Sequence, residues 1–355
     1  MSPTPFLTAS VLALSLAASP VAHAAAASAY VVTPLVSNGV ANTPNIDPNM
    51  VNTWGVAFNP TGLVWVTNER TGTSTLYDGN GVVNPLVVAV PPAAVGASGP
   101  GTPTGIVFSG TSDFVVTNGT TSGPSRFLFA SQDGLISGWA PNVDFANALR
   151  AVVRPGAKYM GLATATSSTG ARLYATDYAH GRVDMFDSSF HLLTAAFKDP
   201  KLPQGLAPFG IQAIGDRVYV TYAKAGAFSG VAGSGNTPDS VIDVFDTDGR
   251  FVHRFATSTS TQQPWGVALA PADFGAHANQ LLVGDFHDGT LTAYDPATGA
   301  AKGQLLDAKG KAVKIPGLWG FQFGNGVNSQ PTNALFYAAG PNGQGGGVYG
   351  KVTVK

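Results

Sequence analysis

The sequence contains no cysteine, which excludes disulfide bonds, a thiolate nucleophile and any metal site built on cysteine sulfur. Charged residues are also scarce, because Asp, Glu, Lys and Arg make up only 11% of the 355 residues. The formal net charge is −1. A protein that binds nucleic acid needs clustered Lys and Arg to displace counterions from phosphates, so this composition argues against a nucleic-acid partner.

Long hydrophobic runs are missing as well. Residues 7–18 form an apolar stretch that is too short to cross a bilayer core of ~30 Å as a helix. Residues 22–24 have the sequence Ala-His-Ala, which is a cleavage site of the A-x-A type. We therefore expect a signal peptide over residues 1–24 and a single mature domain over residues 25–355, exported to the periplasm or the medium, with no membrane span. The segment before the apolar stretch lacks Lys and Arg, which leaves an uncleaved N-terminal anchor as the alternative.

Glycine and proline are abundant, with 44 and 25 residues, as is typical of turn-rich β structure. One pattern, a bulky residue followed by glycine and an apolar run, recurs six times, and the spacings between its glycines are 50, 56, 49, 56 and 54 residues. Six copies at this period predict an all-β fold, a six-bladed β-propeller with four-stranded blades. The glycine has a packing reason, because a Cβ near the propeller axis would crowd the neighbouring blade. The alternative fold is a β-sandwich or two smaller barrels.

A second pattern marks a turn inside the predicted blades. Asn68, Asp177 and Asp285 are each followed four residues later by glycine, which is typical of a hairpin turn with a positive φ. Residues 30–36 form a strand without a blade of their own, whereas the sixth blade lacks an outer strand. We therefore predict that the N-terminal strand closes the last blade, which removes the open sheet edges.

The path of the chain through four-stranded blades predicts where a site lies. The residues before the repeat glycines and the turns between second and third strands share one face, which we expect to hold the mouth of the central channel. An insertion over residues 223–239 should overhang this face. The candidate ligand-binding residues at the channel mouth are Trp54, Thr104, Met160, Phe209, Trp265, Trp319, Asn68, Arg70, Asp177, His180, Asp285 and His287. The three Trp residues have two interpretations, because they either fill a narrow channel or form an aromatic platform for a ligand.

The glycine strands, the turns and the strand ends with Phe-Asp or Tyr-Asp resemble NHL-type six-bladed propellers. Longer runs at residues 52–58, 131–139 and 317–320 are similar to a narrower family of exported bacterial propeller proteins of unassigned function. The resemblance covers nearly the whole mature chain and implies the fold and the export. It implies no catalytic residues.

Two metal chemistries of six-bladed propellers can be compared with these positions. Lactonase-like members place Glu, Asn and Asp beside the repeat glycines as calcium ligands, whereas this chain has Trp, Thr, Met and Phe there, which argues against that mechanism. A zinc lyase needs several converging His residues, but only His180 and His287 fall on the candidate face. A site of two His residues with Asp177 or Asp285 is conceivable. We therefore predict no cofactor, with bound calcium or zinc left open, and the catalytic residues stay unknown.

The main hypothesis from the sequence is an exported binding module, expected to be monomeric, whose ligand docks at the aromatic channel mouth. The ligand could be a small molecule, a glycan or a protein. The second hypothesis is a hydrolase or lyase, with or without a metal, that uses Asp177, His180, Asp285 or His287. The third is a structural role in the matrix or envelope.

Overall fold

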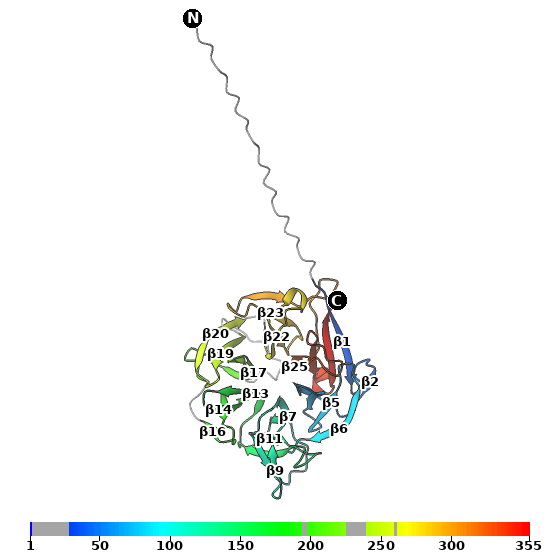
Figure 1. Ribbon diagram of the computed structural model, residues 1–355, viewed down its shortest axis with the longest axis vertical. Helices are drawn as coiled ribbons and strands as arrows, with labels where there is room; N and C mark the ends of the chain where they lie inside the picture. Colours follow the sequence, from blue (N-terminus) through cyan, green and yellow to red (C-terminus); the bar gives the residue numbers. More distant parts are fainter. Residues whose placement is uncertain (2–27, 194–196, 225–238, 259–260) are drawn as a thin grey trace.

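Each repeat glycine lies on the innermost strand of an antiparallel sheet, and six such sheets surround a central axis (Figure 1). The computed structural model describes residue 1 and residues 28–193, 197–224, 239–258 and 261–355. The predicted signal peptide and most of the insertion after residue 223 lie outside these residues. The six-bladed propeller predicted from the repeats is confirmed.

The strands of one blade follow one another along the chain and pair with their neighbours in antiparallel fashion. Blade 1 consists of β3 (Thr53–Phe58), β4 (Val64–Asn68), β5 (Thr73–Tyr77) and β6 (Val83–Ala89). Blade 2 consists of β7 (Pro103–Phe108), β10 (Phe127–Ser131), β11 (Leu135–Trp139) and β12 (Leu149–Val153). Blade 3 consists of β13 (Tyr159–Ser167), β14 (Gly170–Asp177), β15 (Arg182–Phe186) and β16 (Leu192–Leu193). Blade 4 consists of β17 (Leu206–Ile214), β18 (Arg217–Lys224), β19 (Ser240–Asp246) and β20 (Phe251–Ser258). Blade 5 consists of β21 (Pro264–Leu269), β22 (Leu281–Asp285), β23 (Leu291–Tyr294) and β24 (Ala301–Gln304).

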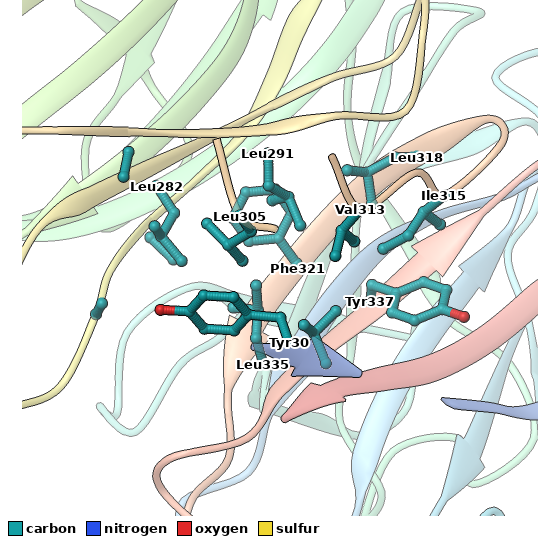
Figure 2. Packing of buried hydrophobic residues seen from close by; sticks show 14 of the residues in the cluster. Tyr30, Leu282, Leu291, Leu305, Val313, Ile315, Leu318, Phe321, Leu335 and Tyr337 are labelled. Carbon is teal, nitrogen blue, oxygen red and sulfur yellow. The ribbon is translucent and has the colours of Figure 1, made fainter. Parts of the chain in front are cut away.

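Blade 6 combines the two ends of the described chain. Its strands are β25 (Leu318–Phe323), β26 (Leu335–Ala339), β27 (Val348–Val354), β1 (Tyr30–Ser37) and β2 (Asn45–Ile46). Strand β1 pairs with β27 in antiparallel fashion, which confirms the predicted closure, and the short β2 adds a parallel edge. Tyr30 is 2% exposed and its ring lies close to Leu305 and Leu335 (Figure 2). Its hydroxyl donates to the carbonyl oxygen of Phe274 over 3.0 Å, so the side chain fixes the first strand.

Elements outside the blades are few in the described chain. The irregular second blade carries a separate hairpin of β8 (Val115–Thr117) and β9 (Ser122–Pro124). The helices are a short α1 (Pro341–Gln344) and one 3-10 turn (Gly275–His277). Neither is long and apolar enough to cross a membrane, and the same holds for every helix found among the described residues.

The repeat glycines lie where neighbouring inner strands approach each other most closely. A Cβ on Gly55 would lie 2.7 Å from the carbonyl oxygen of Thr104 in the next blade, and one on Gly320 would lie 2.6 Å from that of Trp54. On Gly210 it would overlap the carbonyl oxygen of Trp265. The predicted packing reason for the glycine is confirmed.

A threonine on the second strand links the glycine to the next blade. The strand pairing shifts register at the repeat glycine, which leaves its N–H outside the ladder. The Thr67 hydroxyl accepts the Gly55 N–H over 2.8 Å and donates to the Thr104 carbonyl oxygen over 2.7 Å. Thr176 and Thr221 make the same pair of bonds in blades 3 and 4. These hydroxyls satisfy buried backbone groups and join adjacent blades.

The apolar core lies mainly between the blades. Val56 and Tyr77 of blade 1, for example, pack with Phe336 and Tyr349 of blade 6. Corresponding clusters of buried side chains lie between each of the other neighbouring pairs of blades. Each blade is therefore stabilised mainly by its neighbours.

Replacement of Gly210 by alanine should destabilise the propeller by about 1–3 kcal/mol, because the new Cβ overlaps the backbone of the next inner strand. The measurement is the free energy of unfolding in urea. Gly99→Ala is the matched control, since a Cβ there meets no atom within 4 Å and should change stability little. Equal stability of the two variants would contradict the packing role of the glycine.

Candidate functional site

Most of the residues that precede the repeat glycines meet at one end of the central channel. Trp54, Met160, Phe209 and Trp319 are buried, and Trp265 packs against them with part of its surface exposed. Two partly exposed rings from the neighbouring turns, Tyr178 and Phe286, complete this group, which we call the aromatic cluster. The structure therefore brings together five of the six predicted ring residues.

The rings of the aromatic cluster are held in a fixed arrangement. Trp54 and Trp319 stack with centroids 3.5 Å apart, and Phe286 stacks on Trp319 at 3.9 Å. Trp265 meets both indoles edge-on at 6.2 and 6.1 Å. Its Nε1 donates to the carbonyl oxygen of Met160 over 3.1 Å, which links blade 5 to blade 3 across the channel. The stacked rings therefore join blades 5, 6 and 1, and Trp265 extends the contact to blade 3.

Thr104, the sixth ring position, has a different role. Its buried hydroxyl lies 3.1 and 3.0 Å from the carbonyl oxygens of Ala130 and Tyr159 and can donate to either of them. Thr104 therefore joins blade 2 to blade 3 and does not belong to the aromatic cluster.

The channel has more open space at the end opposite the aromatic cluster. Its middle holds a cavity of about 20 Å³ beside Gly55, Gly266 and Gly320, which is room for about one water molecule. The far end holds a cavity of about 180 Å³ lined partly by Gln212 and Gln322. We expected an open mouth on the aromatic face, but four of the ring residues are buried and fill that end. The structure thus favours the interpretation in which the Trp residues pack the channel, with Trp265 partly exposed.

Asn68, Asp177 and Asp285 occupy equivalent positions at the ends of the second strands, and all three are buried. Asn68 donates to the hydroxyls of Thr73 and Thr75 over 3.1 and 3.0 Å. The Asp285 carboxylate accepts the backbone N–H groups of residues 262, 263 and 287 over 2.9, 3.0 and 3.0 Å. Burial nevertheless raises the pKa of Asp285. These side chains hold the turns of the candidate face in place.

Asp177 also orients a histidine. Its Oδ2 lies 2.6 Å from Nδ1 of His180, whose side chain is 43% exposed, while its Oδ1 accepts the backbone N–H of Lys158. Arg70 and His287 are exposed on turns of the first and fifth blades. Among the residues that the structure describes, no group of three or more His, Asp or Glu side chains could hold a metal ion.

Sequence reasoning missed a cavity of about 1030 Å³ between blades 3 and 4. Arg182 and Asp184, two residues apart on β15, line it together with Arg154. The Asp184 carboxylate accepts Arg182 Nε and the hydroxyl of Tyr159, each over 2.8 Å. The sequence held one signal for this cluster, namely the opposite charges of Arg182 and Asp184 at alternate positions of a strand. Such a pair is notable because charged residues are rare in this chain.

A second charged cluster lies behind the same cavity. Arg254 pairs with both Asp199 and Asp243, and its Nε donates to Asp243 Oδ1 over 3.0 Å. Both carboxylates are almost completely buried. Burial raises the pKa of Asp243 to about 6, and the Asp199 charge adds to the shift, while Arg254 opposes it.

Comparisons with known proteins identify relatives of this chain. The uncharacterized protein R648 of Acanthamoeba polyphaga mimivirus is 32% identical over 298 residues, which are 81% of this chain and 72% of R648. The chain belongs to the family of R648. The uncharacterized protein L690 of the same virus is 28% identical over 297 residues, which are 81% of this chain and 76% of L690. These relatives are viral, so the bacterial family suggested by the sequence stays a prediction. No family model matches the chain.

Solved structures resemble the chain at the level of the fold. A streptogramin B lyase matches with a TM-score of 0.52 and 11% identity over 92% of this chain and 97% of the lyase. A Bacteroides thetaiotaomicron protein of unknown function matches with a TM-score of 0.56 and 12% identity over 93% of this chain and 76% of that protein. A glucose dehydrogenase has a TM-score of 0.52 and 13% identity over 90% and 98% of the two chains. At these low identities the likeness shows a shared propeller fold and nothing further.

Replacement of Asp285 by alanine should lower the free energy of unfolding by at least about 2 kcal/mol, because three backbone N–H groups lose their acceptor. His287→Ala is the control, since it leaves the backbone N–H of residue 287 in place. Chemical denaturation measures both. A stable Asp285→Ala variant would show that the carboxylate does not hold the turn.

Replacement of Asp243 by asparagine should flatten the pH dependence of stability. The pKa of Asp243 is about 6 in the folded protein and has its ordinary value of 3.8 in the unfolded chain, so the folded protein binds this proton more tightly. The stability that this proton adds is fully present below about pH 4 and is lost as the pH rises through about 6. The wild type should therefore lose on the order of 2 kcal/mol relative to Asp243→Asn between pH 4 and 7. Urea denaturation at several pH values measures the difference, and parallel curves would contradict the shift.

Proposed function

We propose that the protein is an exported binding module whose ligand docks on the aromatic face, over Trp265, Phe286 and Tyr178. The observation that carries this proposal is the aromatic cluster, whose buried Trp54 and Trp319 support three partly exposed rings. The proposed export rests on the expected signal peptide over residues 1–24. The proposed membership in a family of exported bacterial propeller proteins rests on the resemblance of the sequence to that family.

Rigidity supports recognition by this surface. Trp265 is fixed by its bond to Met160, and Phe286 by its stacking on Trp319. Large rings that are already ordered lose little conformational entropy when a ligand binds. Asn68, Asp177 and Asp285 hold the surrounding turns by hydrogen bonds, so that the rim is also ordered.

A neutral glycan fits this chemistry best. A sugar ring has apolar faces that stack on aromatic side chains and hydroxyls that bond to a polar rim. The exposed side chains on this face include Arg70, which can donate such bonds, and His180 and His287, which can donate or accept them.

Calorimetry with neutral oligosaccharides of glucose, xylose and N-acetylglucosamine tests the proposal. At least one should bind, and Trp265→Ala and Phe286→Ala should each weaken it about tenfold, as expected for a central aromatic contact. Trp139→Phe, at the outer part of blade 2, is the control with unchanged affinity. The proposal fails if none of these sugars binds or if both alanine variants bind like the wild type.

The pair of His180 and Asp177 favours a second candidate, a hydrolase or lyase. A carboxylate 2.6 Å from Nδ1 orients the imidazole and leaves Nε2 to exchange a proton with a substrate. The streptogramin B lyase shares the fold, and the argument for chemistry in this chain rests on the pair alone.

Assays on lactones, esters and glycosides test the second candidate. Any turnover should be lost in His180→Ala. His191→Ala is the matched control, because His191 also pairs with a carboxylate, Asp187, over 3.1 Å but lies on the opposite turn of blade 3. Equal rates for the wild type and His180→Ala would refute this role.

A further inference from the structure

The cavity between blades 3 and 4 is built by segments that are distant in sequence. Strands β15 and β16 form one wall, and Tyr222 of β18 contributes to the other. The link over residues 197–202 and Arg154, just after β12, complete the lining. A volume of about 1030 Å³ is at the upper end of the range for pockets that hold small organic ligands.

The acidic and basic side chains around the cavity differ in their exposure. The side chains of Asp184, Asp199 and Asp243 are 4%, 2% and 0% exposed, whereas those of Arg154 and Arg182 are 35% and 47% exposed. The carboxylates therefore lie behind the surface. The charged groups that a ligand would meet are mainly the N–H donors of Arg154, Arg182 and Lys198.

Several of these donors have capacity left for a ligand. Arg154 pairs with Asp184 from Nε at 3.6 Å, which is longer than a hydrogen bond, and its side chain is 35% exposed, so that its guanidinium can still donate to a ligand. Lys198 lines the cavity and is exposed, and it forms no ion pair within the described ranges. Tyr222 also lines the cavity, and its phenolic hydroxyl is a further donor.

The rest of the lining is apolar. Leu192, Leu193 and Phe197 lie at the outer edge of blade 3 and just beyond it, and Pro200 and Leu202 belong to the link. Apolar surface of this kind contributes roughly 25 cal/mol per Å² when it is covered by an apolar body. The cavity therefore combines an anion-binding side with an apolar side.

We propose that this cavity binds an amphipathic organic anion, with its carboxylate or sulfonate on Arg154 and Lys198 and its apolar body against Leu192, Leu193 and Phe197. A cation is disfavoured because the neighbouring carboxylates are buried and already paired with Arg182 and Arg254. The site shares no side chain with the aromatic cluster, so the two proposals stand independently.

A fluorescent sulfonate and a matched pair of competitors test the proposal. Anilinonaphthalene sulfonate should bind the folded protein, and 4-phenylbutyrate should displace it at least about tenfold better than the neutral 4-phenylbutanol, since a charge-assisted bond is lost in the alcohol. Equal displacement by the two competitors overturns the proposal. So does the absence of sulfonate and phenylbutyrate binding up to millimolar concentrations.

Variants locate the anion within the cavity. Arg154→Met and Lys198→Gln should each weaken phenylbutyrate binding about tenfold and leave phenylbutanol unchanged. Lys201→Gln is the control, because Lys201 is exposed on the same link but does not line the cavity. Lys198→Gln removes an exposed side chain without an ion pair, so its result stands even if Arg154→Met unfolds. Wild-type affinity in Lys198→Gln and in a folded Arg154→Met overturns the assignment.

Discussion

A glycine backbone that lies directly against the next inner strand is the contact on which the rest of this propeller depends. A Cβ at Gly55, Gly210 or Gly320 would collide with a carbonyl oxygen of the adjacent blade. The same register shift that permits this approach frees the glycine N–H, which Thr67 and its counterparts accept while they bond to the next blade. Close approach and hydrogen bonding thus act at the same point, and together they set the small radius of the ring.

That small radius also explains the aromatic cluster. The residue before each glycine lies at the same height on its strand, so the large side chains meet where the channel is narrow. Trp54 and Trp319 come from neighbouring blades and stack at 3.5 Å, which closes this end of the channel. Strand β1 completes the last blade by pairing with β27, and Tyr30 is buried between blades 5 and 6.

The sequence allowed the architecture to be predicted because the constraint repeats. Six glycines at a nearly constant spacing identified the blades, and an unpaired N-terminal strand identified the closure. The candidate site was harder to predict from the sequence. Asp177 and Asp285 were placed on the correct face, but their partners are largely backbone N–H groups, which leave no mark in a sequence. The charges at alternate positions of β15 do not reveal the cavity between blades 3 and 4, because Arg154, Arg182 and Tyr222 come from three parts of the chain that meet only when the blades pack together.

Charge placement distinguishes that pair of blades from the others. Between blades 5 and 6 the contact is mainly apolar, with Leu282, Phe321 and Leu335 in one cluster. Between blades 3 and 4, buried Asp184 pairs with Arg182, and buried Asp199 and Asp243 share Arg254. Buried ion pairs often stabilise a protein no better than apolar residues of similar volume, because desolvation offsets the attraction. Stability alone therefore gives no reason to concentrate charges here, in a chain with only 11% charged residues. The proposed recognition of a charged ligand does give one, because the buried Asp184 orients Arg182, which lines the cavity.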